Sequence, residues 1–367
     1  MDRTYFPNLD GLRFFAAWLV IIHHTEQIKH IFGYASLWDT VVFIRIIGKL
    51  GVVLFFVLSG FLITFLLLEE EQLKEKINTK KFYLRRVFRI WPLYFLILVL
   101  SFLIFPKIEL FEWPGFDESY IYSDIVEKVF LYVFFLPNLA LSTYGIIPYV
   151  SHTWSIGTEE QFYFVWPILL KKFKERRLEL MIGVVFVYLI IKFALLKSVI
   201  PVPYADEITK FWLSFPIDCM AVGGFFAVLY FKNSRFLKYI LRVEVFYLTL
   251  LLFLFLILNG IYIPYLHYEF YSVIFAILII NWGVNRNLKF SLENSLLKYL
   301  GKISYGLYMF HPIGIVSSIL IVSLFNSNNF FLIQFFSLFI TIVISGIFYQ
   351  ILEKPFLLLK NRQSVLT

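Results

Sequence analysis

Residues 9–25 read Leu-Asp-Gly-Leu-Arg-Phe-Phe-Ala-Ala-Trp-Leu-Val-Ile-Ile-His-His-Thr, and this stretch sets the class of fold to expect. It is apolar enough to belong to a membrane-spanning helix, yet it carries Asp10, Arg13, His23 and His24. Ionisable side chains are costly inside a span, so they usually face a protein interior or a water-filled cavity. The stretch therefore predicts a membrane helix bundle with a polar site inside it.

The spacing of the polar residues places them on one side of this helix. Arg13 and His24 are eleven residues apart, which is almost three turns, so both project from one face roughly 16 Å apart along the axis. Asp10 lies near the same face and could pair with the guanidinium of Arg13. Two plainer interpretations stay open: Arg13 could reach a lipid headgroup, and the His23–His24 pair could mark the end of the span.

The composition indicates a polytopic membrane protein. The 367 residues are 60% hydrophobic, 21% aromatic and 16% charged, which excludes an ordinary soluble domain. The net charge of +8 implies no nucleic-acid partner, because Lys and Arg in cytoplasmic loops give the same excess. The single cysteine, Cys219, excludes an internal disulfide and a cysteine metal cluster, and we expect no metal site. No cleavable signal peptide is evident, so we expect insertion of the whole chain.

Ten stretches have the length and apolar character of crossing helices. They lie near residues 12–28, 50–68, 87–105, 153–170, 179–196, 211–231, 244–262, 268–283, 302–324 and 330–353. Two shorter apolar patches, 37–47 and 129–141, are interpreted as re-entrant or interfacial. We predict an all-α polytopic bundle with a single membrane domain over residues 1–360, a short cytoplasmic tail at 361–367 and no appended soluble domain.

The distribution of positive charge predicts the topology. With a cytoplasmic N-terminus, the inner segments hold 25 of the 33 Lys and Arg, and the outer segments hold 7. Because Lys and Arg concentrate in cytoplasmic loops, this predicts about ten spans in the cell (inner or cytoplasmic) membrane with both termini cytoplasmic. The longest outer segment, 106–128, is acidic and aromatic, a composition shared by sugar-handling surfaces and interfacial aromatic belts.

The second and third predicted spans carry further candidates. Ser59 and Gly60 are small residues that let another helix approach closely, whereas a nucleophilic role for Ser59 would need a base such as His24. Arg85 and Arg89 share a helix face at the start of the third span, with Arg86 beside them. Such a cluster suits a phosphate-rich cytoplasmic ligand or, alternatively, lipid headgroups.

The fourth and ninth spans also contain polar residues. Glu159 and Glu160 fall about two turns into a helix and point about 100° apart, so one of them is expected to face a site. A carboxylate that orients an imidazole is common in acyl transfer, and a structural ion pair is the alternative. Ser304, Tyr308 and His311 follow i, i+4, i+7 spacing and form one stripe, with His311 as a hydrogen-bonding or site-lining residue.

Together these segments resemble the acyltransferase-3 family of multi-spanning membrane acyltransferases, in the branch that O-acetylates polysaccharides and other surface glycans. The resemblance spans almost the whole chain. It rests on Arg13 and His24, on Phe55-Phe56-x-x-Ser59-Gly60-Phe61-Leu62, on Arg85-Arg86-x-x-Arg89-Ile-x-Pro92-x-Tyr94, on Trp154-Ser-x-x-x-Glu159-Glu160-Gln161-Phe162-Tyr163, and on Ser304-Tyr305-x-x-Tyr308-x-x-His311-Pro312.

The resemblance implies an enzyme that moves an acyl group, usually acetyl from cytoplasmic acetyl-coenzyme A, to a hydroxyl of an outward-facing carbohydrate such as polysaccharide or lipopolysaccharide of the cell envelope. It implies that His24 is the catalytic base or acyl carrier and that Glu160, or otherwise Glu159, orients or charges it. Donor phosphates would be held by Arg13, Arg85, Arg86 and Arg89. The other implied site-lining residues are Asp10, Ser59, Trp154, Ser155, Tyr163, Ser304, Tyr308 and His311. No permanently bound cofactor is implied; the expected partners are acetyl-coenzyme A, the carbohydrate acceptor and the lipid bilayer.

The chain departs from the family pattern in two places. Val53 stands where many relatives have a polar residue, and the serine-hydrolase-like domain that many relatives carry after the last span is not expected here. The membrane domain would then act alone or with a separate periplasmic or extracellular partner. A non-catalytic transporter or flippase of a glycan-lipid or acyl substrate is the rival interpretation. An acyltransferase acting on a protein or lipid is a third. The sequence does not indicate the acceptor, the acyl length or the oligomeric state.

Overall fold

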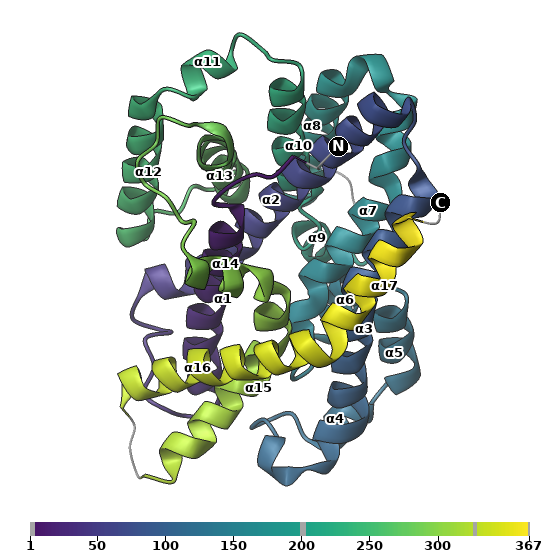
Figure 1. Cartoon of the computed structure of the whole chain (residues 1–367). Helices are drawn as coiled ribbons and strands as arrows, with labels where there is room; N and C mark the ends of the chain where they lie inside the picture. Colours follow the sequence, from purple (N-terminus) through teal and green to yellow (C-terminus); the bar gives the residue numbers. More distant parts are fainter. Residues whose placement is uncertain (1–3, 199–202, 326–328, 366–367) are drawn as a thin grey trace.

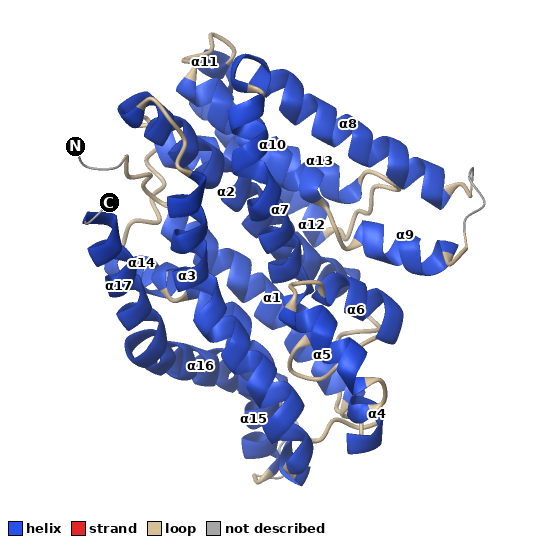
Figure 2. Ribbon diagram, turned by 90° about the vertical axis from the view of Figure 1, so that its right-hand side faces the viewer, coloured by secondary structure: helices blue, strands red, loops and turns tan. Residues whose placement is uncertain are grey.

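The computed structural model describes residues 4–198, 203–325 and 329–365, and its regular structure over these ranges is helical (Figures 1 and 2), with one isolated β-bridge between Trp113 and Phe116. This confirms the prediction of an all-α fold. A helix coincides with each of the ten predicted stretches. These helices are α1 (Leu9–Ile31), α2 (Val42–Lys74), α3 (Thr79–Val99), α7 (Trp154–Lys172), α8 (Arg177–Leu196), α10 (Ile217–Phe231), α12 (Val243–Leu258), α13 (His267–Val284), α15 (Ser304–Ser323) and α16 (Phe330–Phe348).

Shorter helical segments connect these elements. They are η1 (Leu100–Ile104), η2 (Phe105–Lys107), η3 (Glu109–Phe111), α4 (Glu118–Tyr122), α5 (Ile125–Val133), α6 (Pro137–Tyr144), η4 (Ser151–Thr153), η5 (Lys174–Arg176), α9 (Ala205–Leu213), α11 (Leu237–Ile240), α14 (Ser295–Lys302), η6 (Tyr349–Glu353) and α17 (Lys354–Val365). The patch 129–141 falls in α5 and α6. The patch 37–47 is not a separate re-entrant segment, because its second half forms the start of α2.

Seven helices in the described ranges are long and apolar enough to cross a membrane. They lie at Val42–Lys74, Thr79–Lys107, Lys174–Leu196, Ala205–Phe231, His267–Val284, Ser304–Ser323 and Phe331–Leu359. The α12 helix is apolar but has only 16 residues, and α1 and α7 are less apolar because they carry many of the predicted site residues. The chain is therefore a multi-pass membrane protein, while the count of ten spans and the cytoplasmic placement of both termini stay predictions.

The buried share of each helix separates the centre of the bundle from its lipid-facing rim. In α2, 78% of the most apolar 18-residue stretch is buried, and in α13 and α15 the corresponding share is 72%. The corresponding shares for the helices at Lys174–Leu196 and Phe331–Leu359 are 17% and 22%. Because apolar side chains can stay exposed only where lipid covers them, α8 and α16 lie at the rim and α2 at the centre, crossing the bundle diagonally in Figure 1.

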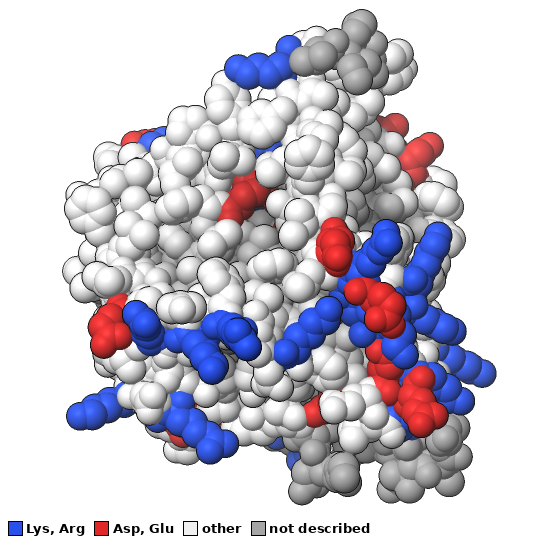
Figure 3. Space-filling model, turned by 90° about the horizontal axis from the view of Figure 1, so that it is seen from above, with Lys and Arg blue, Asp and Glu red and all other residues white. Residues whose placement is uncertain are grey.

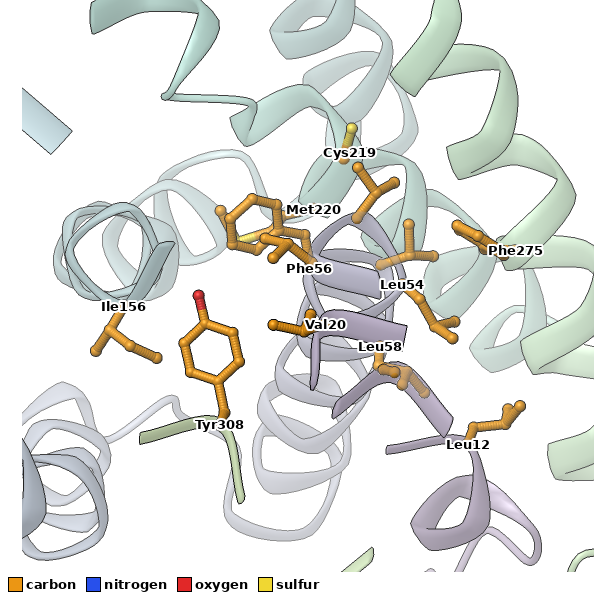
Figure 4. Close-up of a cluster of buried hydrophobic side chains, with 14 of the residues drawn as sticks. Leu12, Val20, Leu54, Phe56, Leu58, Ile156, Cys219, Met220, Phe275 and Tyr308 are labelled. Atoms are coloured by element: carbon orange, nitrogen blue, oxygen red, sulfur yellow. The ribbon is translucent and has the colours of Figure 1, made fainter. Parts of the chain in front are cut away.

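Two glycines bring α2 and α10 into backbone contact. A Cβ atom at Gly60 would overlap the carbonyl oxygen of Met220, and one at Gly223 would overlap that of Val57. Helices in a membrane associate through this kind of close packing at small residues. The predicted close approach at Gly60 is thus present, with α10 as the partner. Figure 4 shows Phe56 of α2 beside Met220 in the apolar cluster at this crossing.

Several contacts gather the predicted inner segments at one end of the bundle. Glu71, near the end of α2, forms an ion pair of 2.6 Å with Arg177 at the start of α8, and Glu69 accepts a hydrogen bond from the backbone of Thr4. Figure 3 looks down on the end that carries α11 and shows many Lys and Arg side chains there. This is the end where the charge distribution predicts the cytoplasm.

The segment before α1 is held by Glu293 from the loop before α14. Glu293 accepts hydrogen bonds from the backbone N–H of Asn8 and from the Tyr5 hydroxyl, and it pairs with Lys298 at 2.5 Å. Burial alone raises the pKa of Glu293, but the hydrogen bonds from Lys298, Asn8 and Tyr5 outweigh burial, so the pKa lies below its usual value. This contact fixes where α1 begins.

Candidate active site

A cavity of about 160 Å³ opens between α1, α2, α3, α7 and α15. It brings together nine of the predicted site residues, which come from all five helices. These nine residues are Arg13, Ser59, Arg86, Arg89, Ser155, Glu159, Tyr163, Ser304 and Tyr308. Apolar side chains such as Val52, Phe55 and Leu62 line the rest of the wall, so the polar groups act in surroundings of low polarity.

Three guanidinium groups face this cavity. Arg13 reaches it from α1 and pairs with Asp10 at 2.6 Å, as the spacing predicts. Arg86 and Arg89 reach it from α3; the guanidinium of Arg86 lies 5.6 Å from the ring of Tyr163, and its Nε has no hydrogen-bond partner among the residues described. Guanidinium groups gathered in an apolar cavity repel one another unless an anion lies between them, which suits a phosphate-bearing ligand.

The fourth predicted donor-binding arginine lies elsewhere. Arg85 donates from Nη2 to Glu70 Oε2 at 3.1 Å, and both side chains are about one-tenth exposed. It is not among the residues that line the cavity. Its position joins α3 to α2, so the structure gives Arg85 a structural ion pair rather than a place beside a donor.

The two adjacent glutamates point in different directions, as consecutive helical residues must. Glu159 faces the cavity, where Oε1 accepts a hydrogen bond of 2.9 Å from Ser59 Oγ and Oε2 accepts one of 3.0 Å from the Tyr163 hydroxyl. Glu160 turns toward α3 and accepts a hydrogen bond of 3.2 Å from Trp91 Nε1. The geometry therefore favours Glu159 over Glu160 as the carboxylate at the site, the reverse of the order that the family resemblance implies.

Ser59 is used as a hydrogen-bond donor. Its hydroxyl donates to Glu159 rather than to His24. The His24 ring forms its hydrogen bond from Nδ1 to the carbonyl oxygen of Val20, at 3.0 Å. A carbonyl oxygen only accepts, so the neutral ring carries its proton on Nδ1 and its lone pair on Nε2. Within the described ranges, neither glutamate bonds to His24; the group that orients this imidazole is a backbone carbonyl.

Further histidines surround His24. The ring of His24 lies 4.8 Å, centroid to centroid, from the rings of both His23 and His311. His311 is fully buried, donates from Nδ1 to the carbonyl oxygen of Tyr308 at 2.6 Å, and lies 4.9 Å from the ring of His152. His311 is thus not a lone imidazole but one of a group.

Tyr308 forms the wall between the cavity and these histidines. Its ring lines the cavity, and its hydroxyl lies 2.6 Å from Ser155 Oγ and donates to the carbonyl oxygen of His152 at 2.6 Å. Its ring also lies close to His311, with centroids 5.8 Å apart. Figure 4 shows Tyr308 at the edge of the apolar core next to Ile156. The cavity and the imidazoles are therefore two adjoining parts of one site.

The remaining predicted residue, Trp154, lies beside the site without lining the cavity. Its ring packs edge-on against Phe56, 6.2 Å away, and Lys49 Nζ lies 5.8 Å from its centroid. Val53, the position that is polar in many members of the family it resembles, is fully buried in the apolar core.

Two residues at the site were missed from the sequence. His152 precedes the Trp154 motif, and only its contact with His311 shows its relevance. Glu353 ends the π-helical segment η6 and does not line the cavity, but it interacts electrostatically with Arg89, which does. It is 6% exposed, and its Oε1 has no hydrogen-bond partner in the described ranges. The sequence signal that could have identified Glu353 is its position as an ionisable residue at the end of the last apolar stretch. Among the described residues, no group of His, Cys, Asp and Glu is arranged to hold a metal ion.

Comparison with known proteins gives several relatives. The O-acetyltransferase OatA of Staphylococcus aureus is 28% identical over 327 residues, which cover 84% of this chain and 50% of that protein. The protein YrhL of Bacillus subtilis is 27% identical over 382 residues, covering 96% and 55%. The peptidoglycan O-acetyltransferase OatA of Listeria monocytogenes is 30% identical over 177 residues, covering 47% and 25%. The chain spans about half the length of the first two relatives.

No solved structure matches this chain significantly. The family comparison, in contrast, covers nearly the whole chain, because residues 6–350 match the acyltransferase domain Acyl_transf_3. That range includes α1 with Arg13 and His24, the arginines of α3, the glutamates of α7 and the polar stripe of α15. From the match over residues 6–350, this chain belongs to the acyltransferase-3 family of membrane proteins.

Proposed function

We propose that this chain transfers an acetyl group from cytoplasmic acetyl-coenzyme A to a hydroxyl of an exported or cell-surface carbohydrate. The observation that carries the proposal is the adjacency of two parts of one site: a cavity with three guanidinium groups, and the imidazole of His24 beyond Tyr308. The names of the relatives, which are O-acetyltransferases, point to the same reaction.

The arginine cavity suits the donor. Coenzyme A carries several phosphate groups, and arginine forks bind phosphate through paired hydrogen bonds. Arg13 is already paired with Asp10, whereas Arg86 Nε has no hydrogen-bond partner among the described residues, and Arg89 shares the cavity with both. With the phosphates held by these groups, the thioester end of the donor would extend along the wall formed by Tyr308 toward the histidines.

The proposed chemistry uses the lone pair on His24 Nε2. In one route this nitrogen takes the proton of the acceptor hydroxyl while the oxygen attacks the thioester carbonyl. The carbon–sulfur bond then breaks, and coenzyme A leaves as a thiolate that takes up a proton. In the other route, Nε2 attacks the thioester carbonyl, the carbon–sulfur bond breaks and coenzyme A leaves as a thiolate. The acceptor hydroxyl then attacks the acetyl-imidazole, the bond to Nε2 breaks, and the hydroxyl proton passes to the thiolate. Both routes need the tautomer that the Val20 carbonyl sets.

Glu159 would shape the cavity rather than touch the imidazole. Its two oxygens hold the hydroxyls of Ser59 and Tyr163, both of which line the cavity. Its negative charge also offsets part of the charge of the arginines before a donor binds. We therefore assign Glu159 a role in organising the donor end of the site.

Acetyl incorporation into glycan tests the proposal. Membranes with wild-type protein, His24→Ala and His30→Ala at matched expression would receive radiolabelled acetyl-coenzyme A, and label in cell-surface glycan would be counted. We expect His24→Ala to lose label by about 100-fold or more, because a positioned acid–base group contributes that much. His30 lies on the same helix but is exposed and paired with Asp39, so His30→Ala should keep its activity. Equal label in wild type and His24→Ala, or no label in any membrane together with no coenzyme A binding, would favour transport instead.

A further inference from the structure

Three histidines from different parts of the chain meet in the interior of the bundle. His24 comes from α1, His311 from α15 and His152 from η4. The ring centroids of His24 and His311 are 4.8 Å apart, and those of His311 and His152 are 4.9 Å apart. His24 and His152 also interact electrostatically, so the three rings form a compact group, here called the histidine cluster.

The hydrogen bonds of the cluster use the ring N–H groups on backbone carbonyls and leave ring lone pairs without a partner. His24 and His311 each use Nδ1 on a backbone carbonyl, which places the ring proton there and leaves Nε2 as an acceptor. His311 Nε2 is buried without a hydrogen-bond partner in the part of the chain that the structure describes, and so is His152 Nε2. The rings are therefore adjacent, but no N–H from one is directed to another.

Such an arrangement is unfavourable when all three rings are neutral. A buried acceptor without a donor loses the hydrogen bond that water would have given it. One added proton changes this, because an imidazolium can donate its new N–H to the lone pair of its neighbour. A second proton would place like charges side by side. The cluster is thus suited to hold one proton and share it between rings.

We propose that His24, His152 and His311 act as one proton-sharing unit, in which His311 takes over the proton that His24 removes from the acceptor hydroxyl. This inference rests on the proposed function for the source of the proton. In the step, the O–H bond of the acceptor breaks, His24 Nε2 gains the proton, and the new oxygen–acyl bond forms as the carbon–sulfur bond of the thioester breaks.

The proton then moves from His24 Nε2 to His311 Nε2, which restores the lone pair of His24 for the next turnover. The proton on His311 is then given up to the thiolate of coenzyme A as it leaves, so the proton of the acceptor hydroxyl ends on the thiol and both rings are neutral again. The position of Tyr308 between the cluster and the cavity puts the group that holds the proton next to the place where the thiolate forms.

The other polar groups around the cluster have partners of their own. On α1, His23 donates from Nδ1 to the carbonyl oxygen of Ile44 at 2.8 Å, and its ring packs against Trp38. One turn further along α1, Glu26 and Lys29 form a fully buried ion pair. On α7, Glu159 is held by Ser59 and Tyr163, and on α2, Lys49 donates to the carbonyl oxygen of Leu213. These groups are committed elsewhere, which leaves the three rings as the unit that exchanges the proton.

Solid-state NMR of the full-length protein in bilayers tests the sharing without any substrate. The protein would be labelled with ¹⁵N-histidine, and signals would be assigned through His24→Gln, His152→Gln and His311→Gln. Because the proposed step starts from neutral rings, acid would be added until the cluster takes up one proton. At that point we expect a nitrogen–nitrogen correlation across a shared proton between His24 and His311 in the wild type, and its loss in His311→Gln. The control is His267→Gln, because His267 is also buried with an unpartnered Nε2 in the described structure but lies on α13; it should keep the correlation.

Turnover supplies the second readout. The rate of coenzyme A release from acetyl-coenzyme A, with cell-envelope glycan present, would be measured in mixtures of H₂O and D₂O. As the fraction of D₂O rises, the wild-type rate should fall along a curve, because more than one proton is in motion. The rate of His311→Gln should be lower by about tenfold or more and should fall along a straight line. Donor binding should be unchanged, since His311 does not line the cavity. His152→Gln serves as a second variant if His311→Gln does not fold.

The outcomes separate this inference from the proposed function. Absence of the nitrogen–nitrogen correlation in the acidified wild-type protein, or its persistence in His311→Gln, overturns proton sharing whatever the activity is. Absence of acetyl transfer by the wild type, with the correlation present, overturns the proposed reaction and leaves the cluster as a proton-binding unit. A straight isotope dependence in the wild type overturns the assignment of His311 as the group that takes over the proton.

Discussion

Replacing Arg86 by Gln should weaken the binding of coenzyme A, whereas the same replacement at Arg85 should leave the affinity almost unchanged. The two residues are adjacent on α3, have the same side chain and carry the same charge, so they form a matched pair. They differ in where they point: Arg86 lines the cavity, with an Nε that has no partner in the part of the chain that the structure describes, and Arg85 is paired with Glu70 outside the cavity.

The expected size of the effect follows from these contacts. A hydrogen bond to a charged group contributes about 1.5–3 kcal/mol, and each 1.4 kcal/mol corresponds to about tenfold in the dissociation constant. Arg86→Gln should therefore raise the dissociation constant of coenzyme A about 10- to 100-fold. Arg85→Gln should leave it within about twofold, because it removes no group from the cavity. Arg85→Gln should instead lower the stability of the fold, because it leaves the nearly buried carboxylate of Glu70 without its cation.

Calorimetric titration of each purified variant with coenzyme A, in the same detergent, measures the affinity without any need for turnover. The melting temperature of each unliganded variant, followed by size-exclusion recovery, measures stability. The phosphate assignment of the cavity would be refuted by an Arg86→Gln protein that is folded and binds coenzyme A as tightly as the wild type. An equal loss of affinity in both variants would show that the cavity and the Arg85–Glu70 pair are not separate.

Three further predictions concern the scaffold. Gly60→Ala should destabilise the fold by about 1–3 kcal/mol or more, because the new Cβ overlaps the backbone of α10, whereas Gly183→Ala on the lipid-facing α8 should cost nothing; melting temperatures compare them. Lys192 and Glu269 form a buried ion pair of 2.5 Å. Lys192→Met should lower the free energy of unfolding by about 3–5 kcal/mol, because Glu269 is left as an unpaired buried charge. The double variant Lys192→Met/Glu269→Gln should recover most of this loss; no recovery would mean that breaking the pair is not the cause. Because the pKa of Glu293 is lowered, its contribution to stability should be complete above about pH 4.3 and lost as the pH falls through the lowered pKa. The melting temperatures of Glu293→Gln and wild type should therefore differ at pH 7 and converge in acid.

The histidines and glutamates show where sequence reasoning reached its limit. The sequence singled out His24 because an imidazole in an apolar helix is unusual, and that argument needs only the local stretch. It could not choose between Glu159 and Glu160, because both lie at the same depth of α7 and only the rotation of that helix decides which one faces the cavity. The structure sets that rotation by packing α7 against α2, where Ser59 meets Glu159.

The histidine cluster depends still more on tertiary structure. His24, His152 and His311 are separated by more than a hundred residues along the chain, and their rings meet only because α1, α15 and the segment before α7 pack together. A single sequence has no local signal for such a contact. The same holds for α2 and α10, whose crossing places Gly60 against Met220.

The sequence by itself determined the membrane class, the all-α fold, the family and the pairing of Arg13 with Asp10. The membrane class, the all-α fold and the Arg13–Asp10 pair follow from composition, from the length of apolar stretches and from spacing within one helix, which are local properties. The family follows from the resemblance of five short motifs along the chain. Only the tertiary structure decided which arginines and which glutamate share a cavity and which histidines touch. Those facts depend on how each helix is rotated and where it crosses its neighbours, and these are set by side-chain packing between segments that are distant in the chain.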